Sequence, residues 1–290
     1  MITSKHRYVV DSAHDGFSVE DYLKDFYISR TIIYQLRRDN SLFTVNDQQV
    51  STKEILHKGD RLELIITEEE NDKIIASNLP LKVIYQDDEV TVIDKPAGMP
   101  AHPSRAHYTN TVENAFKYRF GDKYNCHIIT RLDAATSGIM LIANNRIAAN
   151  ILNKQHTQIA KTYLALVKGR IDNSGMINEP IIRADKGMLR KVDPEGKPAL
   201  THYLLSSYNP QKDASMILCS IETGRTHQIR VHMTHIGHPV LGDRLYNPSD
   251  KSLDRLALHC LAIRFHHPLT NQVIDLITDI PKELNDYIEH

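Results

Sequence analysis

One stretch of the chain sets an acidic and a basic side chain close together ahead of a turn. It reads RLDAATSG over residues 131–138, with Arg131 two positions before Asp133, and it leads directly into the apolar run 139–143. An aspartate ahead of Thr, Ser and Gly is a common turn former, because its carboxylate accepts backbone N–H groups two residues on. On these residues alone, the turn role of Asp133 is favoured over a catalytic one.

Two further stretches carry side chains suited to chemistry. KTYLALVKG, from Lys161, places Tyr163 at the start of an apolar strand, where its phenol can project from the sheet edge. IETGRTHQIRVHMTHIGHPVLGD, from residue 221, predicts a strand, a glycine turn and a helix that begins with Thr226 as N-cap and ends at Gly237. Arg225 is therefore expected at a strand-to-helix corner.

The same long stretch is rich in histidine, which raises the question of a metal. Four histidines crowd it: His227, His232, His235 and His238. No His-Glu-x-x-His pattern and no nearby cysteine accompanies them, so the sequence predicts no metal site and favours phosphate contact or surface placement.

The cysteine pattern and the absence of targeting segments indicate a compartment. The three cysteines, Cys126, Cys219 and Cys260, are odd in number and lack CxxC spacing, which argues against a disulfide framework. The N-terminus has no run of signal-peptide length, and no later run reaches the roughly 18 apolar residues that span a bilayer. We therefore expect a cytoplasmic protein without membrane contact.

The elements that would position these residues fall into two groups. Near the N-terminus, Ser18 and Asp21 form a capping box for a short helix, and a second helix begins at Ser29. This second helix can place three arginines on one polar face: Arg30, Arg37 and Arg38. Short β-like runs follow at 42–45 and 61–66.

After an acidic, linker-like segment around residues 68–72, the pattern changes to a larger α/β or α+β region rich in strands. Helices are predicted at 111–120 and 147–155, and a loop rich in proline and glycine at 95–104. Strand-like runs recur along the rest of the chain, at 90–93, 127–131, 139–143, 163–167, 216–221, 256–265 and 273–277. At 290 residues, two domains are a reasonable expectation. The net charge of −1 does not itself favour nucleic-acid binding, although local basic faces remain possible.

Four motifs in this order resemble those of the RluA-type family of RNA pseudouridine synthases: VIDKPAGMPAHPS, RLDAATSG, KTYLALVKG and GRTHQIRVHMTHIGHPVLGD. The N-terminal stretches SRTIIYQLRR, VND and KGDRLEL are similar to S4-type RNA-binding modules, with Asp47 where that family usually has glycine. A generic α+β cap with solvated arginines is the alternative for this module.

The resemblance implies an architecture. We expect an S4-like module over 1–70, a linker over 71–80 and a catalytic domain over 81–290. The implied fold class is α+β, with a mixed, mostly antiparallel central sheet flanked by helices and loops. The expected state is a monomer.

The resemblance also implies roles for the motif residues. Asp133 would be the catalytic residue, Arg225 would pair with it, and Tyr163 would pack against the target base. Contacts to RNA would come from two groups: the motif residues Arg131, Thr136, Lys161, His227, Gln228 and Arg230, and the helix residues Arg30, Arg37 and Arg38. Thr130 and Ala134–Ala135 depart from the family pattern and are expected to affect RNA contacts or site choice.

The implied reaction is the conversion of uridine in RNA to pseudouridine, which needs no cofactor because an isomerisation requires neither a redox partner nor a group donor. The S4-like module implies 23S ribosomal RNA as the substrate, with transfer RNA as the alternative. A non-catalytic RNA-binding or ribosome-assembly protein is a rival from another class. A retaining glycosidase would need a second carboxylate beside Asp133, which the motifs do not supply.

Overall fold

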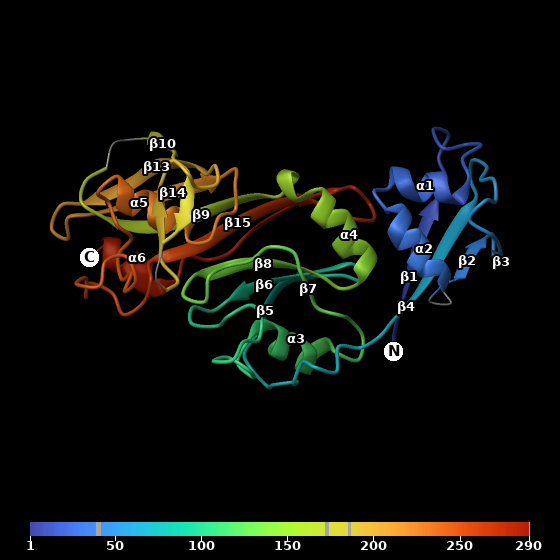
Figure 1. The fold of residues 1–290 in the computed structure, drawn as a ribbon, viewed down its shortest axis with the longest axis horizontal. Coiled ribbons are helices and arrows are strands. Elements are labelled where there is room, and N and C mark those ends of the chain that lie inside the picture. The colour runs from blue at the N-terminus through green and yellow to red at the C-terminus, as the bar shows by residue number, and fades with distance from the viewer. Residues whose placement is uncertain (39–41, 172–173, 185–186, 290) are drawn as a thin grey trace.

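A computed structural model describes residues 1–38, 42–171, 174–184 and 187–289, without the side chains of Gln35 and Arg38. In this part of the chain, the strands form a four-stranded sheet, a ten-stranded sheet and a two-stranded ribbon. Figure 1 shows an elongated molecule with the small sheet at one end and the large sheet occupying the rest. We refer to residues 2–68 as the N-terminal unit and to residues 82–289 as the large unit.

The N-terminal unit packs two helices on its sheet, which has the strand order β1-β4-β2-β3. Its elements are β1 (Ile2–Val9), α1 (Val19–Asp25), α2 (Arg30–Arg38), β2 (Leu42–Val45), β3 (Gln48–Gln49) and β4 (Arg61–Glu68). The predicted cap of the first helix is confirmed, because the Ser18 side chain accepts the Asp21 N–H. Alternate residues of β4, such as Leu62 and Leu64, are buried beneath the helices. The sequence analysis overlooked β1, which pairs with β4 along its whole length.

The hairpin between β2 and β3 shows why Asp47 is tolerated in place of glycine. Val45 pairs with Gln48, so Asn46 and Asp47 form a two-residue turn, with φ values of 50° and 68°. This left-handed region is accessible to Asn and Asp at lower cost than to other side chains. The Asn46 amide also donates to Asp60 at 2.8 Å, which fixes the turn.

The large unit is a mixed, mostly antiparallel sheet, as expected. Its long strand path runs β10-β13-β14-β9-β15-β8-β6-β5, with β16 on β15 and β7 on β8. Among the described strands, the parallel pairing is that of β8 with β15. The strands are β5 (Lys82–Gln86), β6 (Val90–Lys95), β7 (His127–Ile128), β8 (Ser137–Ala143), β9 (Ala160–Lys168), β10 (Ser174–Asn178), β13 (Leu200–Asn209), β14 (Ala214–Ile221), β15 (Leu258–His266) and β16 (Val273–Ile277).

The remaining elements flank this sheet (Figure 1). They are α3 (Val112–Phe120), α4 (Arg146–Lys154), the 3-10 turn η1 (His156–Gln158), the ribbon strands β11 (Ile181–Arg183) and β12 (Arg190–Val192), α5 (Gln228–His235) and α6 (Lys282–Glu289). Every residue of β8 is buried, which explains its unbroken apolar sequence after the turn at 131–138. No helix in the described ranges is both long and apolar enough to cross a membrane.

Candidate active site

The turn ahead of β8 is stabilised by a main-chain hydrogen bond, so the Asp133 side chain is not needed to form it. The Asp133 carbonyl accepts the Thr136 N–H at 3.1 Å. The Asp133 carboxylate instead accepts a hydrogen bond from Arg230 Nη1, at 3.2 Å, and its side chain is 27% exposed. The residue therefore shapes the turn through its main chain and presents a partly accessible carboxylate to a guanidinium.

Arg230 lies on the first turns of α5 and is fixed by a second carboxylate. Its Nε and Nη2 donate to the two oxygens of Asp243 at 2.7 and 2.8 Å, in the bidentate geometry that a guanidinium fork favours. Asp243 is 1% exposed. Burial opposes the charge of Arg230, but hydrogen bonds and charge from Asp243 and Asp133 outweigh it and raise the pKa of Arg230.

The expected pairing of Arg225 with Asp133 is wrong in this structure. Arg225 lies before α5, and its Nε donates to the Pro198 carbonyl at 3.0 Å. The helix begins at Gln228, with His227 as N-cap in place of the predicted Thr226. Because α5 starts there, the inward-facing arginine is Arg230, which was expected to contact RNA.

His227 is held in a strained backbone conformation beside the carboxylate. Its φ of 59° and ψ of 19° are left-handed, which is uncommon for a residue other than glycine. Its Nε2 lies 3.7 Å from Asp133 Oδ2, and its Nδ1 lies 2.9 Å from the Tyr246 hydroxyl. Burial lowers the pKa of His227, with Asp133 acting in the opposite direction. Burial therefore favours the neutral imidazole, here directed at Asp133.

Tyr163 lies on β9 and is 5% exposed. Burial raises the pKa of Tyr163 well above its usual value, with further contributions from Cys260 and the Asp133 charge. Lys161 precedes it by two residues, so the two side chains share one face of the strand. Burial lowers the pKa of Lys161. This face of β9 therefore carries a neutral phenol, within the electrostatic influence of Asp133, and a half-buried amine.

A buried lysine stabilises the turn that carries Asp133 by donating hydrogen bonds to backbone carbonyls. Lys95, at the end of β6, is fully buried, and its Nζ donates to the carbonyls of Pro96, Met99 and Ala134 at 2.9, 2.8 and 3.2 Å. Burial and the Arg255 charge together lower the pKa of Lys95 to about 7, with the Asp133 charge acting in the opposite direction. Because the loop is held through the Ala134 carbonyl, an alanine side chain suffices at this departure from the family pattern.

Several other predicted contacts face inward. Gln228 is 3% exposed, its amide donates to Leu200 O and Thr201 Oγ1, and its Oε1 accepts from Thr223 and Arg225. Thr136 is also buried. The structure therefore assigns Gln228 to the turn before α5 rather than to an RNA surface.

The predicted arginines at the surface are placed differently. Arg131 and Arg30 are exposed, and Arg37 lies 3.5 Å from Glu20, also with an exposed side chain. The side chain of Arg38 lies outside the described residues. Contact of Arg30, Arg37 and Arg131 with RNA stays a prediction.

The histidine-rich segment is engaged in internal hydrogen bonds. His232 is buried, with its ring nitrogens 2.9 Å from Thr201 Oγ1 and from Glu179 O, and His238 Nδ1 lies 2.8 Å from Lys168 O. Within the described ranges, no group of three His, Cys, Asp or Glu side chains is placed to hold a metal ion.

Comparison with known proteins identifies the family of this chain. Residues 89–235 match the family described as RNA pseudouridylate synthase, and residues 7–62 match the N-terminal domain of the ribosomal pseudouridine synthase RluD. The chain belongs to the RNA pseudouridylate synthase family.

Relatives within this family match most of the chain. An uncharacterized RNA pseudouridine synthase of Bacillus subtilis, YjbO, is 33% identical over 94% of this chain and 98% of its own length. The ribosomal large subunit pseudouridine synthase D of Haemophilus influenzae is 35% identical over 80% of both chains. Among solved structures, human RNA pseudouridylate synthase domain containing 1 has a TM-score of 0.62 at 25% identity, covering 73% of this chain and 89% of that one.

Three residues of this candidate site were overlooked in the sequence. Lys95 and Asp243 stand inside motifs that were recognised as wholes, VIDKPAG and GHPVLGD, and Tyr246 follows three residues later. For Lys95 and Asp243, a charged residue at a fixed place in such a motif was the available signal. Their partners were not deducible, since each contact joins segments remote in sequence.

The glycine that ends RLDAATSG is required by close packing and gives a test. Gly138 has a φ of 111°, and a Cβ there would lie 2.3 Å from the Cys260 carbonyl of the paired strand β15. Gly138→Ala is expected to lower the free energy of unfolding by about 2 kcal/mol or more, measured by urea denaturation. Gly224→Ala is the matched control, because nothing lies within 4 Å of its Cβ position and its φ is not left-handed. Equal stability of the two variants would contradict this account.

Proposed function

We propose that this pseudouridine synthase isomerises specific uridines of large-subunit ribosomal RNA, with Asp133 as the catalytic carboxylate. The observation that supports this proposal most directly is the chain of contacts from Asp133 through Arg230 to the buried Asp243. A carboxylate that must act at ribose C1′ or C2′ has to be ionised and oriented, and a guanidinium held from behind does both.

The proposed reaction is balanced without a cofactor. The bond between ribose C1′ and base N1 breaks, the base turns, and C1′ bonds to C5. The C5 proton is lost and N1 gains a proton, so substrate and product are isomers. Asp133 either attacks C1′ to form a sugar ester or removes a C2′ proton to form a glycal; both routes use the same carboxylate.

The surrounding residues have positioning roles in this proposal. Tyr163, a buried residue of β9 that senses the Asp133 charge, provides a ring against which a base taken out of its helix can pack. His227, with Nε2 directed at Asp133 Oδ2, helps to orient that carboxylate. Lys95 holds the loop that carries it.

The division of labour along the chain is also part of the proposal. Residues 1–70 form the S4-like RNA-binding module, 71–80 the linker, and 81–290 the catalytic domain of a cytoplasmic monomer. The match of residues 7–62 to the RluD N-terminal domain and the exposed arginines on α2 support this assignment. The name of the Haemophilus influenzae relative supports ribosomal RNA as the substrate.

The substrate is tested by mapping pseudouridine in total RNA from cells with and without the gene, using chemical labelling and reverse-transcription stops. We expect one or a few sites in large-subunit ribosomal RNA to be lost and to return with the wild-type gene. Loss of sites in transfer RNA alone would contradict the ribosomal assignment. Purified protein that binds unmodified ribosomal RNA without altering any uridine would favour the non-catalytic rival.

A further inference from the structure

Helix α4 belongs to the hydrophobic cores of both units. Its Ile147 and Ile151 are 1% and 2% exposed and lie in the same apolar cluster as the N-terminal core. Ala148 and Leu152, on another face of the helix, pack in the core of the large sheet. Figure 1 shows α4 between the large sheet and the helices of the N-terminal unit. The two units are therefore packed together through one shared helix.

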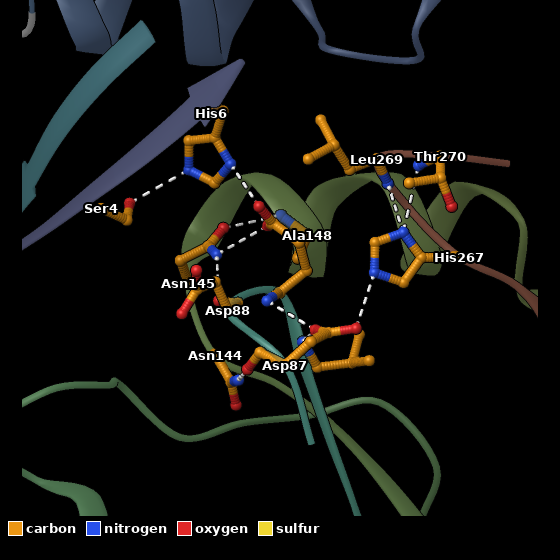
Figure 2. Close-up of polar contacts among 12 residues, drawn as sticks. Ser4, His6, Asp87, Asp88, Asn144, Asn145, Ala148, His267, Leu269 and Thr270 are labelled. Atoms are coloured by element: carbon orange, nitrogen blue, oxygen red, sulfur yellow. Dashed lines mark hydrogen bonds and ion pairs between the residues drawn. The ribbon is translucent and has the colours of Figure 1, made fainter. Parts of the chain in front are cut away.

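A buried polar contact reinforces this packing. His6, on β1, lies with Nδ1 2.8 Å from Glu89 Oε1, and the two side chains are 1% and 5% exposed. The other carboxylate oxygen of Glu89 accepts from the Asn145 amide at 2.9 Å. The imidazole nitrogen and the carboxylate oxygen share one proton in this buried hydrogen bond. Figure 2 shows His6 directed toward Asn145, the N-cap of α4.

The loop that presents Glu89 is itself fixed. Asp87 Oδ1 accepts the Glu89 N–H at 2.8 Å, and His267 Nε2 lies 3.0 Å from Asp87 Oδ2. Two backbone N–H groups donate to His267 Nδ1, so the ring proton is on Nε2 and is donated to Asp87 (Figure 2). Burial raises the pKa of Asp87, but the hydrogen bonds from His267, Tyr85 and the loop backbone outweigh it and lower the pKa to about 2.

A second carboxylate joins the units at the same helix end. Glu68, the last residue of β4, accepts the Arg146 N–H at 2.8 Å and lies 3.3 Å from His127 Nε2. A carboxylate at the first turn of a helix is stabilised by the helix dipole. The segment that follows β4 is also fixed to the large unit, because the Asn114 side-chain amide donates to the Ile75 carbonyl at 2.8 Å. We call His6, Glu68, Glu89 and Asn145 the latch.

We propose that the latch makes the N-terminal unit a rigid ruler that selects the modified uridine by its distance from the S4-like binding surface. This inference rests on the proposed function. Figure 1 places α2 at one end of the elongated molecule and α5, which carries Arg230, toward the other. An RNA that touches the arginines of α2 must therefore present its uridine to Asp133 at one fixed spacing.

The two units are held rigidly because separating them would cost free energy. Separating the units would expose Ile147 and Ile151 to water and break the buried contact between His6 and Glu89. With a flexible linker, the arginines of α2 could bind RNA at many distances from the uridine in the active site. With a fixed arrangement, only an RNA that contacts both α2 and the active site at the same time gains affinity from both. His6 and Glu89 are thus positioning residues, acting through the geometry of the two units.

Rigidity is tested without any assumption about activity. Spin labels on cysteines introduced at exposed Lys53 and Lys251 report the distance between the units in the full chain; the chain without these cysteines measures background labelling. We expect one narrow distance in the otherwise unchanged protein, broadened by Glu89→Ala and unchanged by the control His57→Ala, which alters an exposed histidine of the N-terminal unit. If Glu89→Ala reduces the folded fraction, Glu89→Gln replaces it. A broad distance distribution in the protein without latch substitutions would contradict the proposed role of the latch. A distribution that Glu89→Ala does not broaden would contradict it too.

The consequence for substrate choice is read from kinetics on two RNAs. One is a full-length large-subunit ribosomal RNA transcript; the other is a short stem-loop that carries the same mapped uridine. We expect Glu89→Ala to lower kcat/KM on the long RNA about tenfold and to leave the short RNA within about twofold. Equal losses on both RNAs would overturn the ruler. Absence of turnover by the wild-type protein on either RNA would instead count against the proposed function, with the distance result still standing.

Discussion

Replacing Asp133 with asparagine is expected to abolish pseudouridine formation, lowering kcat by about 10⁴-fold or more. The amide keeps the size of the side chain but can neither attack C1′ nor accept a C2′ proton. RNA affinity and stability should change little, because the turn is closed by the Asp133 main chain and the carboxylate is partly exposed. Single-turnover assays on the mapped RNA, with filter-binding measurements beside them, test this result.

Asp254→Asn provides the matched control, since Asp254 is an exposed aspartate of the large unit. Wild-type kcat in Asp133→Asn would rule out the catalytic assignment. Loss of RNA binding in parallel with activity would mean that Asp133 acts in binding rather than in the chemical step.

Replacing Arg230 with lysine is expected to lower kcat by about 10²- to 10³-fold, as removal of one charge-orienting donor does in other active sites. An ammonium cannot hold both oxygens of Asp243 and still reach Asp133, whereas the guanidinium donates to both carboxylates. The buried Asp243 carboxylate would lose one of its two hydrogen bonds from residue 230, so the free energy of unfolding should fall as well. Single-turnover kinetics and urea denaturation check the two effects.

Arg225→Lys decides between the two arginines of the motif. The structure predicts a smaller loss of kcat for this variant, less than about tenfold, because Arg225 donates to the Pro198 carbonyl rather than to Asp133. Arg264→Lys, an exposed arginine of β15 beside Asp275, serves as the control for lysine substitution in general. A larger kcat loss in Arg225→Lys than in Arg230→Lys would show that Arg225, not Arg230, is the partner of Asp133.

The sequence by itself determined most of the local structure of this protein. Caps such as Ser18 and Thr111 and the buried run of β8 depend on neighbouring residues, so their patterns can be read along the chain. The motifs also pointed to Asp133 and to the family. β13 and the N-terminal β1 were overlooked, because their mixed polar sequences become strands only by pairing with β14 and β4.

Tertiary structure decided which side chains meet. Arg225 and Arg230 stand in one motif, and only the start of α5 at Gln228 turns Arg230 rather than Arg225 toward Asp133, 97 residues away in sequence. Likewise, His6 and Glu89 are 83 residues apart, and nothing in their local sequences indicates a buried pair. Hydrogen bonds and ion pairs depend on distances of a few ångströms, which helix orientation and unit packing set. The sequence therefore identified the chemistry, and the fold selected the partners that control it.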